Sequence, residues 1–201
     1  MSIEFIKSSL LENIDTKTKT LTNLSDLNAI LQISNQFRDT LIAGNKLFFC
    51  GNGGSASDSQ HLATELVVRL RPDINRIPLP CISLTADATI LTAIGNDYGF
   101  ENIFSRQLKA LAVKGDMLTV LSTSGNSPNI LQVLKCAKDL NLKTVGMLGG
   151  NGGEALSFCD YSFLSKSHKT ARIQEMHISV GHIIMELVEN SLIDLKYINP
   201  E

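Results

Sequence analysis

His61 and Glu65 stand four residues apart in the segment SASDSQHLATEL, whose apolar spacing predicts a helix. Residues at i and i+4 of a helix share one face, so an imidazole and a carboxylate would project side by side. Such a pair can transfer protons next to a carbonyl group. An ordinary ion pair on the helix surface fits the spacing equally well, so these two residues alone do not decide the role.

A second polar set lies in the segment RIQEMHISVGHIIME, which contains Gln174, His177 and His182. Gln174 and His182 are about 80° apart around a helix axis and two turns apart along it. A buried structural histidine is the commoner role for any single member of the set. Sequence spacing does not show whether the two predicted helices meet, so a shared site is a hypothesis at this point.

Glycines and serines form the loop GNGGS at 51–55, between an apolar run typical of a strand and the helix of His61. In open α/β sheets, ligands bind where strands end, and backbone N–H groups at a helix N-terminus favour an anion. Glycines let the backbone approach such a ligand closely. An ordinary strand-to-helix turn would use the same residues.

The segment LSTSGNSPNI, residues 121–130, repeats this arrangement with a higher density of hydroxyl groups around Gly125. Pro128 suits the first turn of a following helix. Hydroxyl donors at a helix start predict a phosphate site, although helix capping alone would also use serines. The hydroxyl residues are Ser122, Thr123, Ser124 and Ser127.

Two nucleotide-binding signatures can be compared with these loops. The Walker pattern G-x-x-x-x-G-K-[ST] is absent, because neither loop contains a lysine. Gly51, Gly53 and Ala56 fit G-x-G-x-x-A, but the acidic residue expected about 20 positions later at a strand end is missing. A phosphate site without a nucleotide is therefore favoured.

Alternating strands and helices must position these groups. Apolar runs predict strands at 47–50, 81–84, 117–121, 144–148 and 161–164, and helical periodicity predicts helices at 55–70, 100–112, 128–140 and 171–195. This alternation predicts one α/β domain over residues 1–201, with a parallel sheet covered by helices on both faces.

The first 43 residues are expected to form two amphipathic helices outside the α/β core of 44–201. The threonine-rich stretch DTKTKTLTN is interpreted as the connection between them, and Gly44-Asn45 as the stop after the second. The apolar faces favour an oligomer of identical chains. The alternative is that these helices pack on the chain's own sheet.

Composition limits the class of protein. The chain has 201 residues, 43% hydrophobic and 19% charged, with a formal charge of −2. This is typical of a folded globular domain, and no cluster of Lys and Arg predicts a nucleic-acid partner. No stretch is long and apolar enough for a signal peptide core or a membrane span, so a cytoplasmic protein without a membrane partner is expected.

The cysteines Cys50, Cys81, Cys136 and Cys159 are widely spaced and are expected to be reduced and mostly buried. Cys50 ends the strand predicted at 47–50 and lies beside the glycine loop, where a nucleophile is one interpretation. No adjacent base is apparent in the sequence, so a buried thiol is favoured.

The segments CGNGGSASDSQHLATEL, GNDYGF, STSGNS and RIQEMH followed by a second histidine occur in this order. Together they resemble the sedoheptulose-7-phosphate isomerases, or phosphoheptose isomerases, of the sugar-isomerase (SIS) domain family, over essentially the whole chain. The resemblance implies a SIS domain, a flavodoxin-like three-layer sandwich with a five-stranded parallel sheet and an N-terminal helical extension. It also implies a cytoplasmic homotetramer with active sites between subunits.

The implied reaction converts sedoheptulose 7-phosphate to D-glycero-D-manno-heptose 7-phosphate through an enediol, early in making heptose for bacterial surface polysaccharide. By resemblance, Glu65 and His182 are the catalytic base and acid, in an order left open. The implied zinc ligands are His61, Glu65, Gln174 and His182, although glutamine is a poor zinc ligand. The implied substrate-binding residues are Asn52, Gly53, Gly54, Ser55, Glu65, Asn96, Asp97, Ser122, Thr123, Ser124, Ser127 and Gln174.

A non-catalytic relative offers an alternative of another class. The SIS-fold protein that associates with the replication initiator DnaA resembles this chain in TARIQEMH, where many isomerases have an aspartate at the position of Ala171. That relative lacks counterparts of Glu65 and His182, which favours an enzyme here. A module that only senses a phosphosugar would keep the serine loop and would not need the His and Glu residues.

Overall fold

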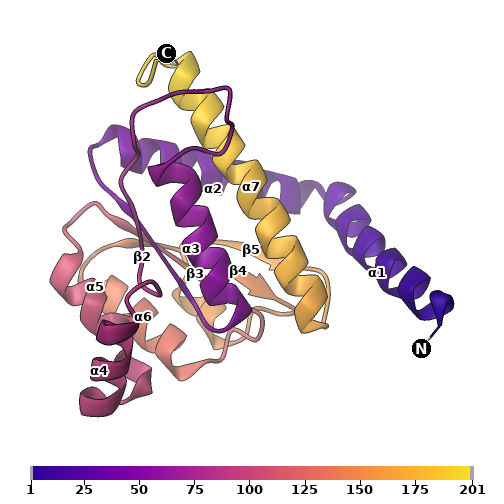
Figure 1. The fold of residues 1–201 in the computed structure, drawn as a ribbon, viewed down its shortest axis with the longest axis horizontal. Helices are drawn as coiled ribbons and strands as arrows, with labels where there is room; N and C mark the ends of the chain where they lie inside the picture. The colour runs from indigo at the N-terminus through magenta and orange to yellow at the C-terminus, as the bar shows by residue number, and fades with distance from the viewer. Residues whose placement is uncertain (1, 200–201) are drawn as a thin grey trace.

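The computed structural model describes residues 2–199 and has one parallel sheet between two layers of helices (Figure 1). The strands are β1 (Leu47–Gly51), β2 (Cys81–Ser83), β3 (Met117–Ser122), β4 (Lys143–Gly149) and β5 (Tyr161–Ser165), in the spatial order β2-β1-β3-β4-β5. All four neighbouring pairs are parallel. The predicted five-stranded α/β fold is confirmed.

The helices are α1 (Ile3–Leu21), α2 (Leu24–Ile42), α3 (Gly54–Val67), α4 (Ala88–Tyr98), α5 (Ser105–Leu111), α6 (Pro128–Asp139) and α7 (Thr170–Asp194). Two short 3₁₀ turns, Phe100–Asn102 and Glu154–Phe158, complete the elements of the described residues. Among the same residues, no helix is both long and apolar enough to cross a membrane.

Each face of the sheet has its own apolar core. Along β1, Leu47 and Phe49 pack with α2, α3 and α7, whereas Phe48 and Cys50 pack with α4, α5 and α6. This alternation follows from the strand geometry, in which successive side chains point to opposite faces. Because both faces are covered, every residue of β1 and β3 is buried.

The threonine-rich stretch predicted to be a connection is instead helical, and this expectation was wrong. α1 runs to Leu21, and the hydroxyls of Thr16 and Thr18 donate to the carbonyl oxygens four residues earlier, at 2.8 and 2.9 Å. These local bonds satisfy the hydroxyls without breaking the helix. The turn between α1 and α2 is therefore confined to Thr22 and Asn23.

The prediction at 100–112 also differs from the structure, which has a 3₁₀ turn and the short helix α5 there. In addition, sequence periodicity gave no sign of α4. Only Ile94 of α4 is buried, so the helix lacks the apolar stripe that reveals an amphipathic helix. Its start is fixed locally, because the Asp87 carboxylate accepts from the backbone N–H of Ile90 at 2.9 Å.

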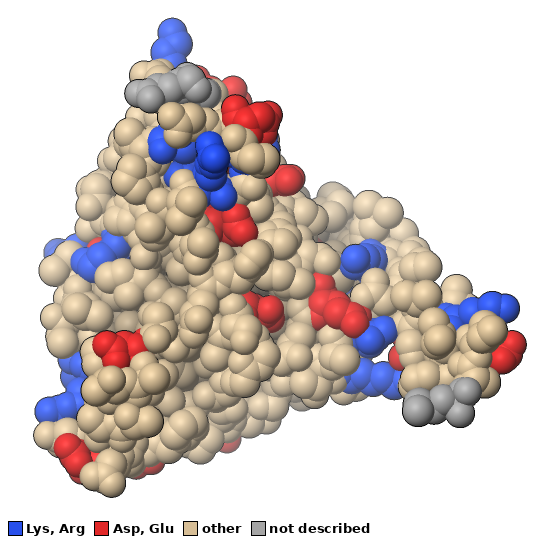
Figure 2. Space-filling view, viewed as in Figure 1, with Lys and Arg blue, Asp and Glu red and all other residues tan. Residues whose placement is uncertain are grey.

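The two N-terminal helices differ in their packing. α2 buries Ile33, Phe37 and Leu41 against the sheet and α7, so for α2 the alternative of packing on its own chain holds. α1 instead leaves an apolar surface exposed, consisting of Ile3, Phe5, Ile6, Leu10, Leu11 and Ile14. On the face of the molecule seen in Figure 2, charged side chains of both signs are scattered between uncharged areas.

Candidate active site

The loops after β1 and β3 enclose a cavity of about 260 Å³ at the carboxyl edge of the sheet. α3 begins at Gly54 and α6 at Pro128, so two helix N-termini adjoin the same space. The lining residues are Asn52, Gly53, Gly54, Ser55, Leu121, Ser122, Thr123, Ser124, Ser127, Thr170 and Gln174. Both polar loops that the sequence singled out therefore border one cavity.

Hydrogen bonds fix the shape of the two loops. The side-chain amides of Asn52 and Asn129 bond reciprocally, each at 2.8 Å, and join the glycine loop to the start of α6. The Ser122 hydroxyl accepts from the Gly125 N–H at 3.0 Å. Gly125 has a φ of +65°, and a Cβ there would lie 1.9 Å from the Gly152 carbonyl oxygen, so only glycine fits.

Ser127 distinguishes a ligand site from ordinary helix capping. It occupies the N-cap position of α6, yet its side chain makes no capping hydrogen bond. Its hydroxyl is thus available to a ligand, together with the positive end of the α6 dipole. The arrangement suits a phosphate group held by neutral donors.

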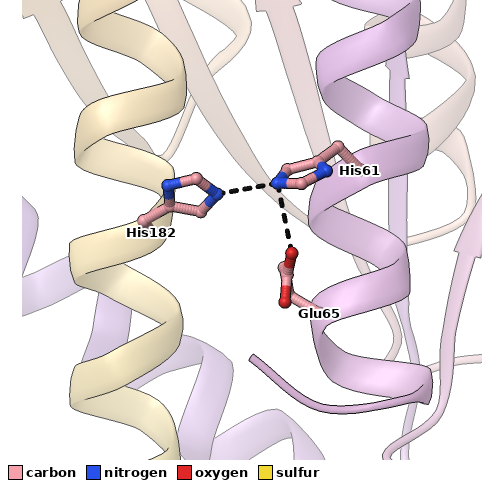
Figure 3. Close-up of side chains that lie close together, drawn as sticks. All are labelled: His61, Glu65 and His182. Carbon is pink, nitrogen blue, oxygen red and sulfur yellow. Dashed lines mark hydrogen bonds and ion pairs between the residues drawn. The ribbon is translucent and has the colours of Figure 1, made fainter. Parts of the chain in front are cut away.

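A cluster of His61, Glu65 and His182 lies between α3 and α7 (Figure 3). The two Nε2 atoms of His61 and His182 are 2.8 Å apart, and Glu65 Oε1 is 3.1 Å from His61 Nε2. The Glu65 side chain is 12% exposed and that of His61 49% exposed. Residues that are 121 positions apart in sequence are thus brought into contact.

This cluster has the composition of a zinc site with an open position. The three ligand atoms lie within 4.8 Å of one another. Tetrahedral zinc bonds of about 2.0–2.1 Å place ligand atoms about 3.4 Å apart, so small side-chain shifts would accommodate the ion. Two imidazoles and a carboxylate are a known catalytic zinc set that leaves one position for water or substrate. The residues therefore fit a zinc ion.

Gln174, the fourth zinc ligand implied by the resemblance, lies nearer the cavity. Its amide faces Gly54, where a Cβ would be 2.7 Å from Gln174 Nε2. It precedes His182 by eight residues, about 12 Å along α7. The structure thus places Gln174 among the residues that line the cavity, at the N-terminal end of α3.

α3 and α7 run parallel and side by side from the cavity to the cluster (Figure 1). Gly54 faces Gln174, and one level further along, a Cβ at Gly181 would be 2.6 Å from the Leu62 side chain. The absence of a side chain at Gly181 therefore permits the close approach of the helices beside His61 and His182. From Gly54 to His61 the distance along α3 is about 10 Å, which an extended phosphosugar spans.

Asp58, one turn before His61 on α3, was not predicted from the sequence to be a site residue. Burial raises the pKa of its carboxyl group, and the neighbouring His61 and His182 partly oppose this by lowering it. Its Oδ2 atom is buried and has no hydrogen-bond partner among residues 2–199. The spacing of three from His61 was the available signal, since it places both on one helix face.

Asn96 and Asp97 lie elsewhere. Both are exposed on α4, where the Asn96 side chain donates to Asp97 at 2.8 Å, and neither is among the described residues that line the cavity. Cys50 is fully buried, and burial raises the pKa of its thiol far above the usual range. The rejection of Cys50 as a nucleophile is consistent with this burial.

Comparison with known proteins agrees with this geometry. The SIS domain family matches residues 12–149. The phosphoheptose isomerase of Nitratidesulfovibrio vulgaris (Miyazaki F) is 48% identical over 165 residues, 82% of this chain and 78% of the relative. That of Aneurinibacillus thermoaerophilus is 44% identical over 196 residues, 98% of each chain.

A solved phosphoheptose isomerase from Francisella tularensis superposes with a TM-score of 0.89 at 35% identity, covering 94% of this chain and 99% of that one. The matches to the Aneurinibacillus and Francisella proteins cover nearly the whole chain, whereas the SIS family match ends before α7. This chain belongs to the phosphoheptose isomerase family of SIS domain proteins.

Proposed function

We propose that this protein is a ketose–aldose isomerase that converts sedoheptulose 7-phosphate to D-glycero-D-manno-heptose 7-phosphate. The observation that supports this most directly is the pairing of a hydroxyl-lined cavity with a His/Glu/His cluster along one helix pair. The cavity suits the phosphate end of an open-chain sugar. The cluster lies about 10 Å further along α3, where the carbonyl end would reach.

The chemistry needs a proton to move between C1 and C2 of the sugar while the oxygens on these carbons exchange roles. Glu65 and His182 provide a carboxylate and an imidazole for this, and both are types of side chain that carry out acid–base catalysis. The low exposure of Glu65 keeps water away from its carboxylate. His61 orients Glu65 through the 3.1 Å contact.

We further propose that His61, Glu65 and His182 hold zinc, with Gln174 approaching from the cavity side. When bound, zinc would polarise the sugar's carbonyl oxygen and stabilise the enediolate. The contacts among the three ligand atoms support this set. Because glutamine is a weak ligand, Gln174 would contribute mainly by binding substrate.

We also propose a cytoplasmic homotetramer formed through the 1–43 helices, around the single SIS domain. The exposed apolar residues of α1 support an assembly that covers them. Asn96 and Asp97, exposed on α4, would then act where subunits meet. Sedimentation of the purified protein measures the state directly.

The decisive experiment is to incubate the purified protein with sedoheptulose 7-phosphate and follow formation of the aldose by NMR. Turnover of the seven-carbon ketose above turnover of shorter ketose phosphates is expected. A protein that turns over none of these phosphosugars would contradict an isomerase. Both alternatives, the DnaA-associating protein and a phosphosugar sensor, are disfavoured because the relatives at 43–51% identity are named isomerases.

A further inference from the structure

Beyond the cluster, the α3/α7 helix pair contains a buried ionic group centred on Glu189. The Glu189 carboxylate accepts from Arg76 Nε at 2.7 Å and, through its other oxygen, from Arg71 Nε at 2.7 Å. The side chains of Arg76 and Glu189 are each 1% exposed. Neither residue belongs to the cavity or the cluster, and the reaction proposed above does not use them.

Arg76 also binds the end of α3. Its Nη2 donates to the Glu65 carbonyl oxygen at 2.8 Å, and its Nη1 to the Leu66 carbonyl oxygen at 2.9 Å. Carbonyl groups in the last turn of a helix have no partner within the helix, and a cation is favoured there by the dipole. One guanidinium thus connects the backbone of Glu65 on α3 to Glu189 on α7.

The ionic group lies close enough to the cluster along α3 and α7 to affect how the cluster's side chains are positioned. Glu189 lies seven residues, two helical turns, beyond His182, and Glu65 itself provides one of the bound carbonyls. α3 and α7 are in direct contact at Gly181, and at the C-terminal end of α3 they are connected through Arg76. His61 and Glu65 flank Leu62 on α3, and His182 directly follows Gly181 on α7, so the cluster lies beside the packed level and within about two turns of Arg76.

We propose that Arg76 and Glu189 are positioning residues, which set the separation of α3 and α7 and thereby hold His61 and Glu65 at ligand distance from His182. The inference rests on the proposed function for its kinetic consequences and on the cluster geometry alone for its structural ones. A merely stabilising role is the competing explanation. Buried ion pairs often contribute little net stability compared with apolar residues of similar size.

Arg76→Lys is the first test, because lysine keeps the charge beside Glu189 but lacks the planar fork that reaches both carbonyl oxygens. Zn²⁺ alone is titrated into the full-length wild-type and variant proteins. Affinity is expected to fall about 10- to 100-fold, the usual effect of removing an outer partner of a metal site. The kcat of isomerisation should fall as well, with the KM for the phosphosugar changed less than about twofold, since the serine loop lies after a different strand.

Asp116→Asn serves as the matched control. The Asp116 side chain is 0% exposed, pairs with Lys46 Nζ at 2.6 Å and accepts from the backbone of Lys46 and Val113 at the amino edge of the sheet. The variant likewise removes the charge of a buried carboxylate, one whose hydrogen bonds go to Lys46 and Val113 and not to α3 or α7. The Asp116→Asn variant should have a lower melting temperature than wild type, with zinc affinity and kcat at the wild-type level.

Equal zinc affinity and kcat in Arg76→Lys and wild type, with only a loss of melting temperature like that of the control, would overturn the proposal. If Arg76→Lys does not fold, the double variant Arg76→Gln/Glu189→Gln removes both charges together. Its zinc affinity, kcat and melting temperature are then measured in the same way. A double variant with wild-type zinc affinity likewise overturns it.

The proposal can fail separately from the proposed function. If the wild-type protein neither isomerises a phosphosugar nor binds zinc, NMR of the metal-free protein still reports the ring contact of His61 and His182 through their imidazole protons. Arg76→Lys is expected to shift these two signals and leave exposed His168 unchanged. Unshifted signals would overturn the positioning role alone.

Discussion

The serine-lined cavity and the His61–Glu65–His182 cluster adjoin the same two helices but are built differently. The cavity is lined by residues in and beside the loops after β1 and β3, which are shaped by local bonds such as the Gly125 N–H to the Ser122 hydroxyl and joined by the Asn52–Asn129 pair. The cluster is made of side chains on two helices and depends on how these helices pack. Local sequence therefore determines the shape of each loop of the cavity, whereas the cluster depends on tertiary packing alone.

This difference predicts that the two regions fail in different ways. Changes in the cavity should weaken binding of the phosphate end and raise KM. Changes in the cluster should leave binding intact and lower kcat, because its groups act on the reacting carbons. Variants in each region test whether this division holds.

The largest effect is expected from Glu65→Gln and His182→Asn. The first keeps the size of the side chain and removes its basicity, and the second replaces an imidazole by an amide that cannot transfer a proton. Each should lower kcat by about 10²- to 10⁴-fold, the range for losing a positioned acid or base. Inorganic phosphate should inhibit the remaining activity as in wild type. Near-wild-type turnover in both variants would show that these residues are not the catalysts.

His177 provides the next test, because it lies on α7 between Gln174 and His182 but is fully buried. Burial lowers its pKa to about 4, and the nearby backbone of Leu148 partly opposes this shift. Neither ring nitrogen of His177 has a hydrogen-bond partner of standard geometry among the described residues. The unfolded chain binds a proton below about pH 6.5 and the folded chain only below about 4. Stability should therefore fall as the pH drops from 6.5 to 4.

The size of this loss is about 3 kcal/mol, from about 1.4 kcal/mol for each unit of pKa difference. His177→Leu removes the titrating group, so urea unfolding of the zinc-free variant should lack this part of the pH dependence. Subtracting the variant from wild type at each pH cancels the titration of other groups. A difference that stays constant between pH 7 and 4 would contradict a neutral buried imidazole.

The sequence predicted those parts of the fold and site that depend on local pattern. Both loops of the cavity were recognisable because glycine and hydroxyl residues follow apolar strands. The sequence could pair His61 with Glu65 but not with His182, because the contact requires the close packing permitted by Gly181. It missed α4, whose mostly exposed residues give no periodic signal, and it misjudged the threonines of α1, whose hydroxyls bond within the helix.

Ser124→Asp tests the cavity itself. A carboxylate there would repel phosphate and remove a donor, at a cost of about 1.5–3 kcal/mol for a hydrogen bond to a charged group, hence a KM about 10- to 100-fold higher. The kcat should change much less. Ser157→Asp introduces the same charge on an exposed serine outside the cavity and should leave KM unaltered. An unchanged KM in Ser124→Asp would show that this loop does not bind the phosphate group of the substrate.

Gly54→Ala gives the smallest expected effect and tests where the two regions divide. The backbone of Gly54 accepts alanine, but the new Cβ would lie 2.7 Å from Nε2 and 2.9 Å from Oε1 of Gln174. The flexible Gln174 side chain must therefore swing away from the cavity. Losing one hydrogen bond of about 0.5–1.5 kcal/mol to substrate predicts a KM about 2- to 10-fold higher, with kcat and melting temperature nearly unchanged.

A double-mutant cycle with Gln174→Ala isolates this cause, because Gly54→Ala should have no further effect once the amide is gone. Zinc titration of Gly54→Ala then shows whether Gln174 belongs to the cavity, as a substrate-binding residue, or to the cluster, as a zinc ligand. If Gln174 binds only substrate, as its position beside Gly54 indicates, zinc affinity stays at the wild-type value while KM rises. If zinc affinity falls with the displaced amide, Gln174 is a ligand, and the cavity and the cluster share a residue instead of dividing at this level of the helix pair.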